Sequence, residues 1–395
     1  MFPKKDFPIF SHYPQLHYLD NAATTQKPRV VIDALTRTYQ EANAHVHRGI
    51  YELGERATLQ YNAVRSLVAH YCGAVSDEII FTRNATEGIN FIASSWASKQ
   101  LKSGDEIIIS MLEHHANILP WIRLEQEQGI ILKYIPLTFE GNLDYEAYES
   151  LITTKTKLIA ITHTSNVLGT KVDIKRVVAS AKRVQARVLL DATQAAGREH
   201  LSLGTLGIDF AVFSGHKMLG PTGIGILYIA QEMQDEVAPY QLGGGMVHSV
   251  NFHEYTVAKS PYKYEAGTPA IADALALGTA IEYLTEVSFE ALKKYEAGLC
   301  ARLIDGLLQI RHISILGPID QLRQSGHMVS FVSSKAHAHD VATYLDRVNI
   351  CVRAGNHCAQ PLHRALGVDA SVRASVYGYT VESDIELLIQ ALDSL

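Results

Sequence analysis

Six short segments between residues 78 and 229 are almost continuously apolar, and this limits the folds open to the chain. The segments are 78–82, 106–110, 158–162, 187–191, 210–214 and 225–229. Because apolar and polar residues do not alternate in them, we expect strands buried on both faces, as in a mostly parallel sheet covered by helices. Segments with helical patterns lie between them, for example 86–102 and 173–185. The sequence therefore predicts an α/β fold.

The character of the sequence changes after residue 264. Two segments of helical length come first, and shorter strand-like segments follow: 271–287, 288–310, 327–332 and 349–354. We therefore expect two domains. Residues 15–264 would form a large, mostly parallel sheet domain. Residues 1–14 and 265–395 would form a smaller α+β domain, joined to the first by bridging helices.

Composition argues against several classes of protein. The chain has 35 Lys and Arg against 41 Asp and Glu, with no basic block, so we expect no nucleic-acid partner. Its 4 cysteines form no CxxC pair, which argues against a disulfide framework and against a thiolate metal site, and favours a reducing compartment. The sequence contains neither a signal-peptide core nor an apolar stretch of membrane-spanning length. We therefore expect a cytoplasmic protein with no membrane association.

Lys217 and Asp191 each come at the end of an apolar strand, 210–214 and 187–191. In an open parallel sheet, ligands bind beyond the carboxyl ends of the strands. An amine and a carboxylate at that edge suit pyridoxal phosphate, which needs a Schiff-base amine and an acid facing its pyridinium nitrogen. Without a partner, a buried carboxylate would be costly to ionise. The alternative interpretation is that Asp191 only caps the next helix.

Residues beside these strand ends are candidates for binding the cofactor phosphate. Thr86 lies in the first turn of the helix after 78–82, where free N–H groups and the helix dipole attract anions. A simple helix cap is the alternative. Ser214 and His216 flank the lysine and could donate hydrogen bonds to the same phosphate.

Polar residues after two further strands are candidates for contacting the cofactor ring. His114 or His115, after the strand 106–110, could cover one ring face and move protons. Asn166, after 158–162, could reach a ring oxygen or a substrate carboxylate, and Gln194 could donate to the ring hydroxyl. For Asn166 the alternative is a plain turn residue.

Cys358 lies in a glycine-containing loop, which suggests sulfur chemistry on this cofactor. A thiol attacks only as thiolate, and His357 and Arg353 could lower its pKa. The alternatives are a buried small hydrophobic residue or a zinc site made of His357, Cys358 and His363. Arg353 and Arg373 are candidates for binding an amino-acid carboxylate through a bidentate fork.

An ordered set of phrases runs through almost the whole chain. They are YLDNAATTQKP (18–28), HVHRGIYEL (45–53), RNATEGIN (83–90), EHHANILPW (113–121), THTSNVLGT (162–170), LDATQAAG (190–197), FSGHKMLGPTGIGILY (213–228), YEAGTPAI (264–271), VRAGNHCAQPL (352–362) and VRAS (372–375). The set resembles the pyridoxal-phosphate enzymes of the class V aminotransferase family, specifically the group II cysteine desulfurases of the SufS and CsdA type.

The resemblance implies fold type I, a homodimer and conversion of L-cysteine to L-alanine, with a persulfide left on the enzyme. Lys217 would be the Schiff-base lysine and proton shuttle, Cys358 would attack the substrate sulfur, and His114 would stack on the ring. The sulfur would pass to an acceptor protein of the SufE type, for iron–sulfur cluster assembly.

The resemblance also assigns the binding residues. Asp191 would pair with the pyridinium nitrogen and Gln194 with the ring hydroxyl, while Asn166 and Arg373 would bind the substrate carboxylate. The phosphate would be bound by Thr86, Ser214 and His216, with Thr268 reaching in from the other subunit.

Three positions depart from the commoner family pattern. Ala85 stands where a second threonine is frequent, which leaves only a backbone N–H for the phosphate. Asn356 replaces a frequent histidine near Cys358, and Thr380 stands where asparagine is usual near Arg373. The alternative functions are a selenocysteine lyase that acts on L-selenocysteine, another class V enzyme, and a catalytically silent sulfur-transfer scaffold.

Overall fold

The main sheet of the computed structural model has seven strands in the order β2-β8-β7-β6-β5-β3-β4. Their bounds are β2 (Ile79–Thr82), β3 (Glu106–Ser110), β4 (Ile131–Ile135), β5 (Thr156–Thr162), β6 (Arg187–Asp191), β7 (Phe210–Ser214) and β8 (Gly225–Ile229). The structure describes residues 1–47 and 49–395. Pairing is parallel from β7 to β4, which confirms the mostly parallel sheet.

Strand β8 is the exception, since it runs antiparallel to both β7 and β2. Only residues 215–224 connect β7 to β8. A parallel connection needs a crossover of about a dozen residues or more, so this short turn reverses the chain. That turn carries Lys217.

Edge strand β4 was not predicted. Its residues Ile131–Ile135 are mostly exposed or half-buried and include Lys133, so the segment lacks the continuous apolar character of the inner strands. An edge strand next to solvent on one side does not need that character.

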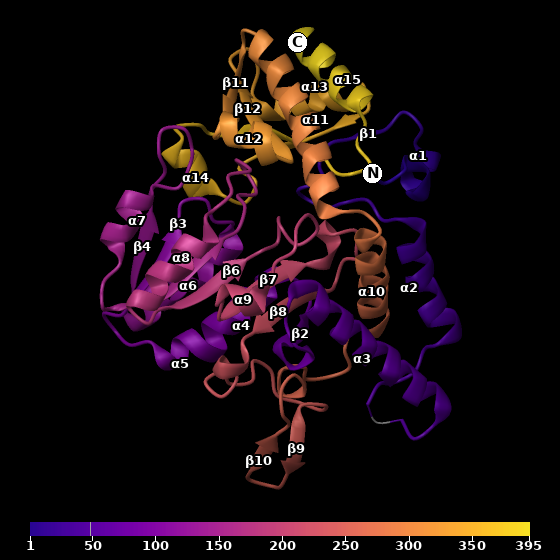
Figure 1. Ribbon diagram of the computed structural model, residues 1–395, viewed down its shortest axis with the longest axis vertical. Coiled ribbons are helices and arrows are strands. Elements are labelled where there is room, and N and C mark those ends of the chain that lie inside the picture. The colour runs from indigo at the N-terminus through magenta and orange to yellow at the C-terminus, as the bar shows by residue number, and fades with distance from the viewer. Residues whose placement is uncertain (48) are drawn as a thin grey trace.

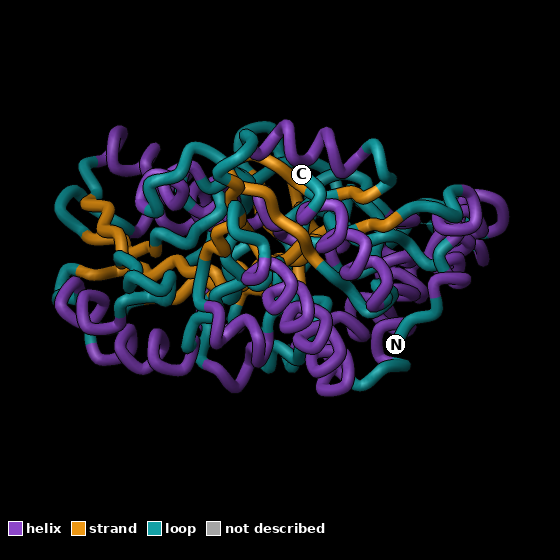
Figure 2. Tube along the Cα trace, turned by 90° about the horizontal axis from the view of Figure 1, so that it is seen from above, coloured by secondary structure: helices purple, strands orange, loops and turns teal. Residues whose placement is uncertain are grey.

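Helices cover the sheet on both sides, as the view in Figure 2 shows. Their bounds in the first part of the chain are α1 (Pro8–His12), α2 (Arg29–Glu41), α3 (Glu52–Cys72), α4 (Ala85–Ile92), α5 (Ser98–Gln100), α6 (Leu119–Gln128), α7 (Tyr145–Leu151), α8 (Ile174–Arg183) and α9 (Leu203–Leu206). Helix α10 (Ile271–Thr285) packs against α2 and α3. Among the described residues no helix is both long and apolar enough to cross a membrane.

A second, antiparallel sheet has the order β11-β12-β15-β14 and lies at the top of Figure 1. Its strands are β11 (Ile313–Leu316), β12 (Met328–Ser333), β14 (Arg353–Gly355) and β15 (Ser371–Ser375), and nearby are α11 (Phe289–Gln309), α12 (Ile319–Ser325), α13 (Ala338–Asp346), α14 (Gln360–Ala365) and α15 (Glu382–Asp393). Strand β1 (His17–Tyr18) pairs with β13 (Ile350–Cys351). The hairpin of β9 (Val247–Val250) and β10 (Tyr255–Val257) projects from the molecule in Figure 1.

Two hydrophobic clusters underlie the two sheets. The first includes the main sheet and residues of α10 such as Leu277, together with Phe2 and Phe7 near the amino terminus. The second is built from α11, α13, α15 and the smaller sheet. The domain boundaries inferred from the sequence stay a prediction.

Candidate active site

The carboxyl ends of β5, β6 and β7, together with the start of α4, enclose a polar pocket. Nine of the residues predicted from the sequence line it: Thr86, His114, Asn166, Asp191, Gln194, Ser214, His216, Lys217 and Arg353. Because β5, β6 and β7 are parallel neighbours, their carboxyl ends meet at one edge of the sheet. The predicted residues are therefore brought together by strand order.

Lys217 lies in the turn Gly215–Lys217 directly after β7. Burial lowers the pKa of its amine from 10.5 to about 8; Asp191 opposes this shift, whereas Arg373 and Arg353 add to it. The amine is therefore partly neutral near neutral pH, as Schiff-base formation requires.

The turn that carries Lys217 is held by residues of the phrase 18–28 to which the sequence assigned no role. The carbonyl of His216 accepts hydrogen bonds from Thr24 Oγ1 (3.0 Å), Thr25 N (3.1 Å) and Lys27 Nζ (2.8 Å). Thr25 Oγ1 in turn accepts from Leu219 N at 3.0 Å. The available signal was the phrase 18–28, but no pattern within it points to His216.

Asp191 ends β6 with its carboxylate buried, and burial raises its pKa while Thr193 and Lys217 oppose the shift. Its Oδ1 accepts from Thr193 N at 3.0 Å. The residues that follow form turns up to α9, so the helix-cap alternative is not what the structure shows. The motif 83–90 does contain a helix cap, because Asn84 caps α4 by accepting from Glu87 N, and phosphate binding by Thr86 stays a prediction.

Several buried atoms beside the pocket indicate that it fits pyridoxal phosphate. Within the described chain, Gln194 Oε1 and Thr193 Oγ1 are buried without a hydrogen-bond partner. A cofactor with ring substituents would supply the missing partners.

Ser214 Oγ accepts from Ala85 N at 2.9 Å, so the backbone N–H expected to face the phosphate already has a hydrogen-bond partner.

The two neighbouring histidines have different roles. His114 lines the pocket, and its Nδ1 accepts from Ala116 N at 3.1 Å, which leaves the proton on Nε2. Burial, followed by the charge of Lys217, lowers the pKa of His114 to about 3, so its ring is neutral. His115 instead binds the cysteine loop: its N–H donates to the carbonyl of Cys358 at 2.7 Å.

Cys358 is half-buried, and Arg353 Nη2 lies 3.7 Å from its sulfur. His357 does not supply the positive charge suggested by the sequence. Burial and the charge of Arg373 lower its pKa to about 2, so it is neutral, and its Nε2 lies 3.0 Å from Ser371 Oγ. The described residues contain no cluster of three or more possible metal ligands. The zinc set considered above is therefore not brought together as a metal site.

Arg373 is almost completely buried and already has two partners. Its Nη1 donates to the carbonyl of Asn166 at 2.7 Å, and its Nη2 donates to Asp20 at 2.9 Å. Its Nε is buried and has no hydrogen-bond partner in the described part of the chain. Asp20 was not predicted from the sequence.

The side chains at the two remaining departures from the family pattern, Asn356 and Thr380, form hydrogen bonds with the backbone. Asn356 Nδ2 donates to the carbonyl of Asp369 at 2.5 Å and so ties the loop to the strand that follows. Thr380 Oγ1 accepts from Tyr377 N at 3.0 Å. Neither contact involves Cys358 or Arg373.

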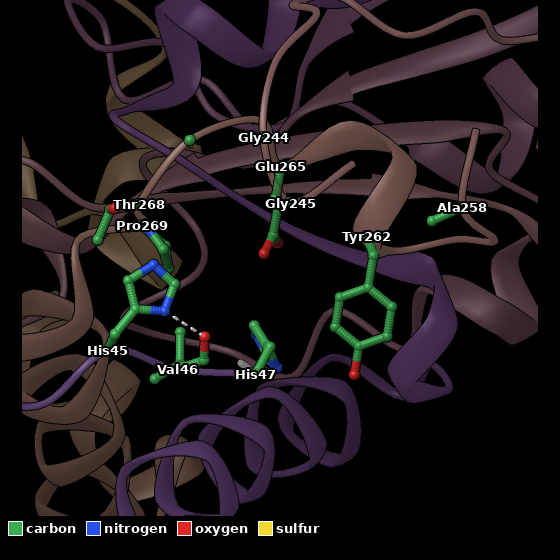
Figure 3. Close-up of a pocket in the computed structure, with 11 residues that line it drawn as sticks. His45, Val46, His47, Gly244, Gly245, Ala258, Tyr262, Glu265, Thr268 and Pro269 are labelled. Carbon is green, nitrogen blue, oxygen red and sulfur yellow. Dashed lines mark hydrogen bonds between the residues drawn. The ribbon is translucent and has the colours of Figure 1, made fainter. Parts of the chain in front are cut away.

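Thr268 is not brought into this pocket. It lines a separate one with His45, Tyr262 and Glu265 (Figure 3). Glu265 there forms a buried bidentate pair with Arg65 at 2.6 and 2.8 Å. The contribution of Thr268 to a partner subunit stays a prediction, and Arg48, within the phrase 45–53, lies outside the described residues.

Residues 17–388 match the family described as aminotransferase class-V, and the chain belongs to this family. A probable cysteine desulfurase of Synechocystis is 42% identical over 99% of this chain and 94% of its own length. The apo cysteine desulfurase of Thermococcus onnurineus superposes with a TM-score of 0.95 at 36% identity, over 99% of this chain and 96% of that one. The Escherichia coli cysteine desulfurase CsdA gives a TM-score of 0.92 at 35% identity, over 99% and 96%. The predicted family and fold class are therefore confirmed.

Proposed function

We propose that this protein is a pyridoxal-phosphate-dependent cysteine desulfurase that converts L-cysteine to L-alanine. The observation that carries the proposal is the grouping of a partly neutral Lys217 amine, the buried Asp191 carboxylate and Arg353 in one pocket, with the Cys358 thiol 3.7 Å from Arg353. The similarity to cysteine desulfurases over the full chain supports it.

The residues divide the work of binding and proton transfer. When bound, the cofactor supplies an electron sink for the pair released at Cα. Asp191 would keep the ring nitrogen protonated, and Gln194 would bind the ring hydroxyl. The neutral Lys217 amine would take the Cα proton and return it later. Neutral His114 would cover one ring face.

Binding of phosphate and substrate falls to the remaining residues. Thr86, Ser214 and His216 would bind the phosphate, with Thr268 of a partner subunit in a homodimer. Burial lowers the pKa of His216 to about 4, so it would act as a neutral donor. The substrate carboxylate would be bound by Asn166, Arg353 and Arg373.

Sulfur transfer uses Cys358 as the nucleophile. Its thiolate attacks the substrate sulfur, an S–S bond forms, and the substrate C–S bond breaks. The bonding electron pair stays on Cβ, which takes up a proton and becomes the methyl group of alanine. The persulfide on Cys358 would then pass to an acceptor of the SufE type, in the cytoplasm, for iron–sulfur cluster assembly.

The Cys358→Ala variant tests this function. Purified holoenzyme is incubated with L-cysteine or L-selenocysteine and a reducing thiol, and alanine is measured. We expect the variant to lose alanine formation from cysteine while keeping the cofactor and much of the selenocysteine cleavage, since the weaker C–Se bond does not require the thiol.

Cys351→Ala is the matched control, because Cys351 is also half-buried and lies on the neighbouring strand β13. It should keep activity on both substrates. Full cysteine desulfuration by Cys358→Ala would remove this thiol from the mechanism. A wild-type enzyme active only on selenocysteine would identify a selenocysteine lyase instead.

A further inference from the structure

The Cys358 loop has a backbone conformation that requires support. His357 and Cys358 have φ angles of 49° and 58°, so two successive non-glycine residues are left-handed. Such conformations persist only where the surrounding structure holds them. Two contacts hold the backbone of the loop: Asn166 Nδ2 donates to the carbonyl of His357 at 2.7 Å, and His115 N donates to the carbonyl of Cys358 at 2.7 Å.

A third set of contacts involves Ser371, the first residue of strand β15. Ser371 Oγ lies 3.0 Å from His357 Nε2 and 2.9 Å from His363 Nε2. His363 Nδ1 lies 3.1 Å from the carbonyl oxygen of Ala359. All three side chains are buried, with exposed fractions of 2% or less.

The hydrogen positions in this chain follow from its acceptors. The Ala359 carbonyl can only accept, so His363 carries a proton on Nδ1. Burial lowers the pKa of His363, which favours the neutral ring, and in the neutral ring Nε2 is an acceptor. The Ser371 hydroxyl must then donate to His363. Its oxygen is left to accept from His357 Nε2–H. The hydrogen bonds therefore run in one direction, from His357 through Ser371 and His363 to Ala359.

We propose that His357, Ser371 and His363 form a positioning relay that holds Cys358 in its left-handed conformation and so presents its thiol to the pocket. The relay connects both sides of the cysteine: it begins at the residue before Cys358 and ends on the carbonyl of Ala359, the residue after it. This role rests on the proposed function of Cys358 as sulfur acceptor. In this role the three relay residues contact neither substrate nor cofactor.

Two variants break the relay at different points. Ser371→Ala removes both central hydrogen bonds. His363→Met removes the acceptor for Ser371 and the donor to the Ala359 carbonyl, and puts an apolar side chain of similar length in their place. For each holoenzyme we expect the kcat of alanine formation from cysteine to fall about 10- to 100-fold with KM changed less than about threefold, because small misplacements of a reacting group have effects of this size. His363→Gln, which keeps an acceptor oxygen, should retain most of the activity.

The double variant tests whether the three residues act as one unit. If they do, Ser371→Ala/His363→Met should be no slower than the worse single variant, because the chain is already broken. Multiplicative losses, or equal losses in His363→Gln and His363→Met, would show independent packing effects and overturn the relay.

The chemical reactivity of the Cys358 thiol tests the relay without depending on turnover of substrate. The alkylation rate of Cys358 by iodoacetamide is followed by peptide mass spectrometry, with Cys351 as the internal reference. We expect the alkylation rate of Cys358 to change at least about threefold in Ser371→Ala and His363→Met, because the reactivity of a thiol depends on the groups around it. It should not change in Ser180→Ala, which removes another buried serine hydroxyl, on α8.

Unchanged alkylation together with unchanged kcat in both relay variants would overturn the proposal. If Ser371→Ala does not fold, the His363→Met and His363→Gln pair carries the test. If the wild-type enzyme makes no alanine from cysteine, the proposed function fails, while the alkylation rates still decide whether the relay positions Cys358.

Discussion

The lowered pKa of Lys217 leads to a quantitative prediction for the protein without cofactor. Burial lowers this pKa from 10.5 to about 8. At pH 7 about one Lys217 amine in ten is then neutral, compared with about one in 3,000 for a solvated lysine. Lys217 therefore has about 300-fold more free amine for bond formation at that pH.

Reductive methylation of the apoprotein by formaldehyde measures this difference, since the reagent is small and does not titrate in this range. The rate at Lys217, read by peptide mass spectrometry, should rise about tenfold from about pH 6 to about pH 7 and level off above about pH 8. Exposed Lys99 corrects for reagent concentration.

The Asp191→Asn variant tests the contribution of Asp191, which opposes the lowering of the Lys217 pKa by burial. Because the Asp191 carboxylate raises the pKa of Lys217, its removal should move the half-maximal rate to a lower pH. A rate at Lys217 that still rises about tenfold per pH unit beyond about pH 9 would refute the reasoning. So would a half-maximal rate that moves upward in the variant.

Two further predictions concern the holoenzyme. Asp191→Asn should keep the fold and the bound cofactor but slow alanine formation by orders of magnitude, because the ring nitrogen loses its charge partner; near-normal kcat would contradict this. Lys27→Met should lower kcat several-fold by removing the hydrogen bond to the His216 carbonyl at 2.8 Å, with Lys27→Arg restoring most of it; equal kcat in Lys27→Met and wild type would show that the contact is dispensable.

The sequence by itself determined every described strand of the main sheet except β4, and nine of the residues that line its pocket. Continuous apolar segments specify inner strands, and β3, β6, β7 and β8 have the bounds predicted for them. Since neighbouring parallel strands end at one edge, Asp191 and Lys217 had to lie close together once their strands were identified. Both inferences depend on local properties of the chain, and local properties can be read from the order of residues.

Only the tertiary structure decided the contacts that orient these groups. Arg373 forms a hydrogen bond with Asp20, and Lys27 forms one with the carbonyl of His216. Ser371 forms hydrogen bonds with both His357 and His363. Thr268 was placed in a separate pocket. No periodicity marks such pairs, because hydrogen-bond partners far apart in sequence are chosen by the packing of whole elements. A buried polar group must find whichever partner that packing brings within reach.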